Sequence, residues 1–314
     1  MKLRFWGVRG SIPTPLGPAR LRSKISAIAE RMRPADLSDA SSREKFLASL
    51  PDYLFNTVGG NTACVEIAAD VGHRIIFDAG TGIRELGLDI SASKRPANCH
   101  IFFSHFHWDH IQGLPYFAPA FDPDNAIHYY SPRPDFREVL EAQMREPYFP
   151  ISMSAMKARS EFVVLRGQAQ RIGIANVHYR PMRHPGGCHS YLVEAEGVKV
   201  VYSTDTELDS AEFVKTAENA RYFGDLDALI IDAQYTLGEA IEKNNWGHSS
   251  FSLASDFAAT WGIKRLILFH HEPNYSDRKI DLLLRNAASY LDHLEARGIE
   301  VILAREGLEL DIRR

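Results

Sequence analysis

The run from His105 to His110 is the part of the sequence best suited to do chemistry. It reads His-Phe-His-Trp-Asp-His, so imidazoles and a carboxylate alternate over six residues. Zinc and similar cations bind imidazole nitrogen and carboxylate oxygen, and a two-residue spacing on extended backbone turns His105 and His107 to one side. Asp109 and His110 then offer two further ligands. The run therefore predicts a metal site.

Other potential ligands stand at the ends of apolar runs. Residues 101–104 predict a strand that delivers the His105 run to a rim of the fold. Similar apolar runs end at Asp205 and at the pair His270-His271, and His184 stands before a Pro-Gly-Gly turn. A lone histidine or aspartate in such a position is common. Together, however, these residues supply the ligands that one local cluster lacks for a site with two metals.

Short apolar and β-branched runs recur along the chain and predict strands. The expected strands are residues 2–6, 63–68, 74–77, 100–104, 127–130, 162–165, 174–180, 190–194, 199–203, 228–231, 265–269 and 300–303. Several are apolar throughout, which is typical of strands covered on both faces. Helical patterns occur at residues 136–146, 249–261 and 281–297, the last with Gly298 as its stop. This order predicts an α/β fold of two sheets flanked by helices, in one domain over residues 1–314.

Residues 17–56 differ from this strand-rich background. They contain prolines, several serines and a mixed helical pattern in which Leu21, Ile25 and Ile28 recur at helical spacing. Two interpretations stay open for this insertion. It is either a helical insertion on the surface, or a cap or dimerisation arm that helps to enclose the substrate.

Composition argues against several classes of protein. The net charge of −4 is too close to neutral to favour a nucleic-acid polymer or a membrane surface as partner. Charged residues interrupt the N-terminus, so it does not read as a secretory signal, and the longest apolar runs are too short to span a bilayer. Cys64, Cys99 and Cys188 are odd in number and lack Cys-x-x-Cys spacing. We therefore expect buried thiols and a cytoplasmic protein.

In combination these motifs resemble the metallo-β-lactamase fold superfamily, and within it the phosphodiesterase branch that includes tRNase Z and the phosphoribosyl cyclic-phosphate phosphodiesterases. The matching elements follow the family's order and are His105-x-His107-x-Asp109-His110, His184-Pro-Gly-Gly, Ser203-Thr-Asp205 and Leu268-Phe-His270. Residues 77–82 also resemble the superfamily's Asp-x-Gly turn. The resemblance implies an αββα sandwich, in which two β-sheets are flanked by helices.

The resemblance also implies a binuclear centre with its ligands divided between two divalent cations. The first metal would be held by His105, His107 and His184. The second would be held by Asp109, His110 and His270, with Asp205 bridging both. Zinc is the expected metal and manganese the alternative, because mixed histidine and carboxylate ligands suit both. Asp78 either supports the ligand loop through hydrogen bonds or is a simple turn former before Gly80.

His248 bears on the type of hydrolysis. The segment 245–250 resembles the His-Ser-Thr stretch of tRNase Z-like enzymes, in which the histidine assists departure of the leaving-group oxygen. A phosphodiester releases an alkoxide, which needs a proton, and a histidine beside the metals can supply it. Asp109 would orient the nucleophile. His248 could instead be only a neighbour of the helix cap at Ser249 and Ser250.

The expected substrate is a small phosphodiester, preferably cyclic, such as a cyclic nucleotide. Trp108, Tyr116, Phe117 and Trp246 lie near the motifs and would either stack on a base or pack in the core. The main alternative is an acyl hydrolase, a lactonase or thioesterase, on the same fold. An RNA-processing nuclease and a metal-binding protein without turnover are weaker alternatives. The resemblance is also compatible with a homodimer.

Overall fold

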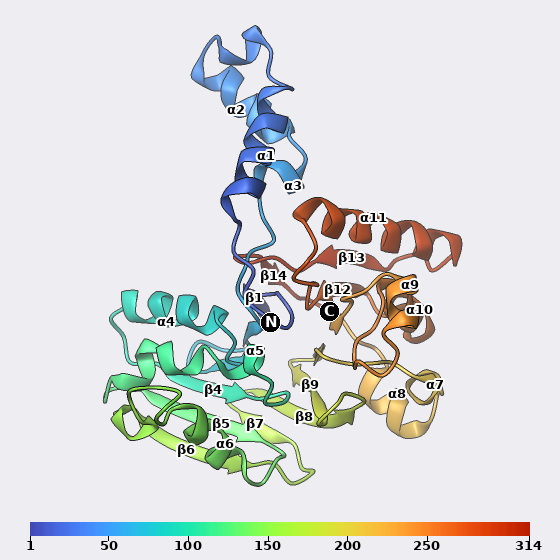
Figure 1. The fold of residues 1–314 in the computed structure, drawn as a ribbon. Coiled ribbons are helices and arrows are strands. Elements are labelled where there is room, and N and C mark those ends of the chain that lie inside the picture. The colour runs from blue at the N-terminus through green and yellow to red at the C-terminus, as the bar shows by residue number, and fades with distance from the viewer.

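Two seven-stranded sheets form the centre of the structure, a computed structural model that describes all residues from 1 to 314 (Figure 1). The first sheet has the order β14-β1-β2-β3-β4-β5-β6. Its strands are β1 (Lys2–Gly7), β2 (Cys64–Ala68), β3 (Arg74–Phe77), β4 (Asn98–Phe102), β5 (Ala126–Ser131), β6 (Arg159–Val164) and β14 (Glu309–Asp311).

The second sheet has the order β13-β12-β11-β10-β9-β8-β7. Its strands are β7 (Gln170–Ile172), β8 (Ala175–Met182), β9 (Cys188–Ala195), β10 (Val198–Ser203), β11 (Ala228–Asp232), β12 (Arg265–Phe269) and β13 (Glu300–Leu303). The two sheets have the same pattern of parallel and antiparallel strands. Strands β3 to β6 and strands β10 to β13 pair in parallel, whereas every other neighbouring pair is antiparallel. The carboxyl ends of the parallel strands therefore lie at one edge of each sheet.

The sheets pack face to face over a core rich in aromatic side chains. Phe77 stacks on Tyr202 with ring centroids 5.1 Å apart, and Tyr191 and Phe102 pack against the same cluster. Each such ring is fully buried and stabilises the fold by roughly 1.5–3 kcal/mol. This inner core holds the two sheets, and so the ends of their strands, in fixed relation.

Helices cover the outer face of each sheet. Helices α4 (Gly82–Ala92) and α6 (Phe136–Gln143) bury apolar residues against the first sheet, and α8 (Ala217–Phe223), α10 (Phe251–Trp261) and α11 (Asp277–His293) do so against the second. The short helices are α5 (Trp108–Ile111), α7 (Ser210–Phe213) and α9 (Leu237–Glu242). The order of layers is helix, sheet, sheet, helix, which confirms the predicted αββα sandwich.

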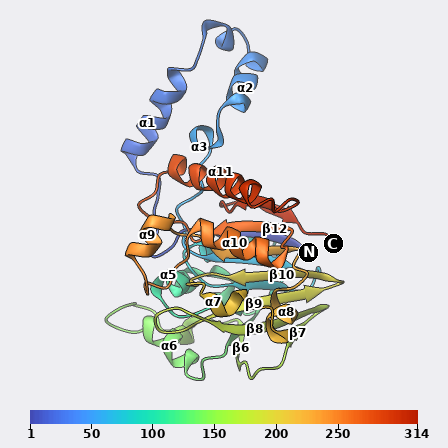
Figure 2. The same ribbon diagram turned by 90° about the vertical axis from the view of Figure 1, so that its right-hand side faces the viewer.

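The insertion at residues 17–56, here called the arm, projects away from the sandwich (Figure 2). It contains α1 (Pro18–Ala29), α2 (Ala40–Ser49) and α3 (Asp52–Phe55), and α1 buries none of its residues. At its base, the backbone N–H of Thr14 donates to the carbonyl of Gly60 at 2.7 Å, so the two ends of the arm lie side by side. The arm is helical along most of its length and stands out from the body.

Some boundaries differ from the expected ones. The last long helix begins at Asp277 rather than 281, because the hydroxyl of Ser276 caps it by accepting from the N–H of Lys279. It ends at His293, before Gly298, because Glu295 already adopts a left-handed backbone with φ 53°. Strands β7 and β14, of three residues each, were not expected.

All three cysteines are buried and free, as expected. None of the helices has the combination of length and apolar character that crossing a bilayer requires.

Candidate active site

The seven predicted ligands lie after strand ends in both sheets and meet in two clusters that share Asp205. His105 and His107 follow β4, and Asp109 and His110 belong to α5. Asp205 follows β10, His184 follows β8 and His270 follows β12. The ligand atoms of each cluster all lie within 4.8 Å of one another. Packing of the two sheets thus unites side chains that are up to 165 residues apart in sequence (270 − 105).

The first cluster contains His105, His107, His184 and Asp205. Nε2 of His184 lies 3.1 Å from Nδ1 of His107. Nε2 of His105 and Nε2 of His184 each lie 3.7 Å from Oδ2 of Asp205. Three imidazole nitrogens and one carboxylate oxygen thus converge on one point, which is the donor set of a hydrolytic zinc site.

The second cluster contains Asp109, His110, Asp205 and His270. Nε2 of His110 lies 3.1 Å from Oδ2 of Asp109 and 3.1 Å from Oδ1 of Asp205. Nε2 of His270 lies 3.1 Å from the same Oδ1 of Asp205. Asp205 therefore directs Oδ2 to the first cluster and Oδ1 to the second, which is the geometry of a bridging carboxylate.

Electrostatics in both clusters suit bound cations. Burial lowers the pKa of His105, His107 and His184, which keeps their imidazoles neutral and their lone pairs available. Burial opposes protonation of His110 as well, but the carboxylates of Asp109 and Asp205 raise its pKa well above the ordinary value. These carboxylates thus attract positive charge strongly. Moreover, Nε2 of His105 and Nε2 of His110 are buried without a hydrogen bond, so the residues fit metal ligation.

Asp78 supports the second cluster from behind. Its carboxylate accepts hydrogen bonds from the backbone N–H and hydroxyl of Ser104, at 2.7 and 2.8 Å, and from the hydroxyl of Tyr202 at 2.7 Å. It also lies 2.8 Å from Nδ1 of His110. A proton on that nitrogen leaves Nε2 with its lone pair toward the cluster. Asp78 therefore does more than form a turn.

Two other ligands are held in the same way. Nδ1 of His184 lies 2.9 Å from the carbonyl of Gly247, and Nδ1 of His270 lies 3.0 Å from Oε1 of Gln234. The amide of Gln234 is in turn oriented by a 2.8 Å bond from its Nε2 to Glu272. Each outer bond directs Nε2 of the ligand to the cluster. Sequence reasoning did not identify Gln234, which lies in an irregular segment after β11.

Three residues of the site have a strained backbone. Asp78, Asp205 and His270 have φ of 61°, 46° and 60°, a left-handed conformation that costs about 1 kcal/mol or more for residues with a Cβ. Gly10 lies directly against His270, since a Cβ at Gly10 would be 2.5 Å from the imidazole. The next residue, Ser11, donates its backbone N–H to Oδ2 of Asp109 at 2.7 Å. The loop after β1 thus closes over the second cluster.

His248 lies at the edge of the clusters and is paired with Asp232. Nδ1 of His248 is 2.6 Å from Oδ2 of Asp232, and its ring centroid is 5.1 Å from that of His270 and 5.3 Å from that of His184. Burial lowers the pKa of His248, but the charge and hydrogen bond of Asp232 outweigh it and raise the pKa to about 9. Asp232 was missed from the sequence, although it ends an apolar strand much as Asp205 follows one.

Comparison with known proteins identifies the family. Residues 73–271 match the β-lactamase superfamily domain, a span that exceeds half of the chain. The chain belongs to the β-lactamase superfamily. With its two sheets and paired histidine-aspartate clusters, it is a metal-dependent hydrolase of the metallo-β-lactamase fold.

Relatives of this superfamily member include two proteins named as ribonucleases. Ribonuclease Z of Picrophilus torridus is 25% identical over 284 residues, which cover 76% of this chain and 86% of that protein. Ribonuclease BN of Escherichia coli O157:H7 is 23% identical over 261 residues, covering 68% and 83%.

Solved structures share the fold across nearly the whole chain. The metallo-β-lactamase fold protein YhfI from Bacillus subtilis superposes with a TM-score of 0.65 at 15% identity, covering 98% of each chain. A diphosphatase from the PhnP family gives a TM-score of 0.64 at 18% identity, covering 99% of this chain and 98% of that one.

The surroundings of the hydrolase site are partly aromatic. Trp108 is 81% exposed and Trp246 is 62% exposed, and both are within two residues of site side chains. Tyr116 is also exposed, whereas Phe117 is fully buried in the core.

His271 points away from the ligand clusters, since its Nε2 lies 2.8 Å from the carbonyl of Ala304. Burial lowers the pKa of His271 to about 3. His271 therefore has a structural position outside the clusters.

Proposed function

We propose that this protein is a binuclear metal-dependent phosphodiesterase that hydrolyses a small phosphodiester, preferably cyclic, such as a cyclic nucleotide. The observation that carries the proposal is the pair of His248 and Asp232 beside two ligand clusters bridged by Asp205. Such a pair provides a proton where a leaving-group oxygen departs. The relatives named as ribonucleases, and the structural neighbour named as a diphosphatase, support chemistry at phosphorus.

The ligand roles in this proposal follow the two clusters. His105, His107 and His184 would hold one divalent cation, Asp109, His110 and His270 would hold the other, and Asp205 would serve both. Two cations bound there would activate a water molecule and neutralise the charge of the phosphate oxygens. We propose zinc, with manganese as the alternative, because both accept this mixture of nitrogen and oxygen ligands.

The protein's own side chains then carry out positioning and proton transfer. Asp109 is held by the N–H of Ser11, so its carboxylate has a fixed direction from which it orients the attacking water. Asp232 occupies Nδ1 of His248, which leaves Nε2 to deliver a proton. Because Asp232 raises the pKa of His248, the imidazolium persists at neutral pH and can protonate the departing alkoxide. A thioesterase would have less use for this proton donor, because a thiolate departs without protonation.

The space beside the first cluster supports a small substrate. A cavity of about 330 Å³ is bordered by His105, His107, Arg133 and the Gly186-Gly187 turn, which is at the lower end of the range for small-molecule sites. Exposed Trp108 and Trp246 offer flat faces on which a nucleotide base could stack. A phosphodiester carrying one base fits both features.

An RNA-processing nuclease is the second candidate. It is favoured by the names of the two ribonuclease relatives and by the basic side chains of the arm. The near-neutral charge of the whole chain disfavours a nucleic-acid polymer as substrate. The arm alone, residues 17–56, is slightly basic, with seven basic and five acidic residues. Because two relatives are named as ribonucleases, RNA stays a candidate substrate.

A substrate panel would separate these functions. The metal-loaded protein, with its metals identified by elemental analysis, would be given bis-p-nitrophenyl phosphate, 2′,3′- and 3′,5′-cyclic nucleotides, a structured RNA and a lactone. We expect turnover of the diesters, with a cyclic nucleotide preferred. Cleavage of RNA with inert cyclic nucleotides would favour the second candidate. Lactone cleavage with inert diesters would contradict the proposal.

A further inference from the structure

A second polar cavity lies where the arm joins the sandwich. This arm-base cavity has a volume of about 290 Å³ and is lined by residues of α1 and α3, by the start of α11 and by Arg9 and Thr14 of the loop after β1. It shares no residue with the ligand clusters or with the cavity beside His105. Its charged side chains are Arg9, Arg20, Lys24, Arg31, Asp277 and Arg278.

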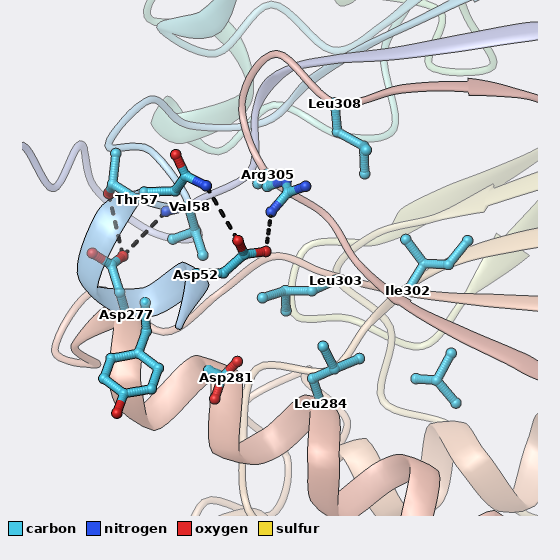
Figure 3. A pocket seen from close by; sticks show the side chains of 13 residues that line it. Asp52, Thr57, Val58, Asp277, Asp281, Leu284, Ile302, Leu303, Arg305 and Leu308 are labelled. Atoms are coloured by element: carbon cyan, nitrogen blue, oxygen red, sulfur yellow. Dashed lines mark hydrogen bonds and ion pairs between the residues drawn. The ribbon is translucent and has the colours of Figure 1, made fainter. Parts of the chain in front are cut away.

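The one carboxylate in the arm-base cavity is already neutralised. Asp277 is buried, with Nζ of Lys24 at 2.5 Å and Nη2 of Arg9 at 3.7 Å. It also accepts hydrogen bonds from the hydroxyl of Thr57 and the backbone N–H of Val58, at 3.2 Å each. Both bonds appear in Figure 3, which views the neighbouring cavity that shares Asp277 and Thr57. Asp277 therefore has no charge left to balance other cations.

Three arginines remain without an acidic partner. Arg20 and Arg31 lie on one stripe of the arm with Lys24 and Ala27, and Arg278 is in the first turn of α11. Arg20 bonds only the carbonyl of Tyr275, at 3.4 Å, and Arg31 only the carbonyl of Ala27, at 2.7 Å. No carboxylate lies within 4.0 Å of any of the three guanidinium groups. All three side chains are exposed, so their charges are available to an anion from solution.

Neutral groups of the arm-base cavity also suit an anion. Ser23 and Ser276 line it and their hydroxyls can donate hydrogen bonds, whereas the hydroxyl of Thr14 already donates to the carbonyl of Ile12 at 3.1 Å. Ser276 is the N-cap of α11, whose 17 residues direct the positive end of the helix dipole at the cavity. Guanidinium groups match the geometry of phosphate oxygens with paired N–H donors. The chemistry thus points to an oxyanion such as a phosphate group rather than a halide.

We propose that the arm-base cavity is a binding site for a phosphate group, separate from the scissile phosphate. The phosphate would be held by Arg20, Arg31 and Arg278, with Ser276 and the N-terminus of α11 beneath it. It belongs either to the substrate itself, at a distance from the bond that is cleaved, or to a separate phosphorylated molecule.

The loop after β1 connects this cavity to the ligand clusters. Arg9 and Thr14 line the cavity, while Gly10 and Ser11 between them contact His270 and Asp109. The three residues from Ser11 to Thr14 can span at most about 10 Å. The cavity therefore borders the segment that fixes Asp109.

Inorganic phosphate, titrated calorimetrically into the metal-loaded full-length protein, tests the proposal. We expect a class of sites that Arg31→Ala with Arg278→Ala weakens by at least about 30-fold, since each charge-assisted bond contributes roughly tenfold. The control is Arg22→Ala with Arg33→Ala, which removes the same charge from exposed arm residues outside the cavity. Phosphate binding at the ligand clusters is common to all three proteins. Equal binding by all three would overturn the proposal, whether or not the protein turns over phosphodiesters.

The source of the phosphate is identified by kinetics on a dinucleotide with and without a 5′-phosphate. If the substrate supplies the group, the cavity variant raises KM about tenfold or more for the phosphorylated dinucleotide alone. If both KM values stay unchanged while phosphate binding is lost, the cavity serves a separate phosphorylated molecule.

Discussion

The ligand clusters and the arm-base cavity are joined by residues 9–14, yet they are built in opposite ways. The ligands follow buried strands, and Asp78, Gly247 and Gln234 each hold an imidazole by its second nitrogen. Arg20, Arg31 and Arg278 of the cavity are exposed, and Arg20 and Arg31 have only backbone carbonyls as partners. A site that performs chemistry needs ligands fixed before the substrate arrives. A site that only holds a phosphate can use long side chains that adjust to it.

Because the ligands are fixed in advance, we expect that replacing even one atom of a cluster residue causes a large loss of metal and activity. Asp205→Asn removes the charge that both clusters share, so we expect at least one of two metals to be lost and turnover to fall by about 10⁴-fold or more. Elemental analysis and initial rates measure the two effects. Asp225→Asn is a matched control, because Asp225 has the same left-handed backbone, with φ 57°, but is exposed. Two bound metals with full activity in Asp205→Asn would show that Asp205 does not bridge.

A smaller effect is expected from Asp232, which contacts the clusters through His248. Asp232 raises the pKa of His248 to about 9, and bound cations would lower it from that value in wild type and variant alike. His248 acts as an acid, so activity falls as pH rises through its pKa. Asp232→Asn lowers this pKa, and the alkaline limb of kcat should move to lower pH by about 1–3 units. Superimposable pH profiles at equal metal content would rule out this role for Asp232.

The smallest effect on turnover is expected from the arm. Thr14 and Gly60 are hydrogen-bonded at its base, so a short Gly-Ser linker can replace residues 17–56. We expect kcat for bis-p-nitrophenyl phosphate to change by less than about threefold, since no arm residue belongs to the clusters. Phosphate binding at the arm base should be lost. A large fall in kcat with a folded, metal-loaded protein would mean that the two regions are not separable.

The same contrast explains what could be predicted from the sequence. The seven candidate ligands were found in the His105–His110 run, at the ends of apolar runs and, for His184, before a Pro-Gly-Gly turn. The family resemblance then assigned them to two metals. The two-sheet architecture followed from the continuously apolar strands. The arm-base cavity has no such signal, because Arg20, Arg31 and Arg278 are exposed residues from segments more than 240 residues apart (278 − 31 = 247).

Other features of the structure were not predicted from the sequence for local reasons. Strands β7 and β14 are three-residue edge strands, too short for alternation to be visible. Asp232 carries the same strand-end signal as Asp205, but one aspartate after an apolar strand is common, and only the 2.6 Å contact with His248 identifies it. The start of α11 depends on the Ser276 cap, which lies four residues before the apolar periodicity becomes regular.

Proton delivery by His248 to a departing alkoxide is the central claim, and dependence on the leaving group tests it most directly. The measurement is the ratio of wild-type to His248→Ala kcat, at matched metal content, for a 2′,3′-cyclic nucleotide and for bis-p-nitrophenyl phosphate. The aryloxide departs without a proton, whereas the alkoxide needs one. We predict a loss of about 10²–10⁴-fold for the cyclic nucleotide and a loss of less than about tenfold for the aryl diester. Equal losses on both substrates would contradict the account.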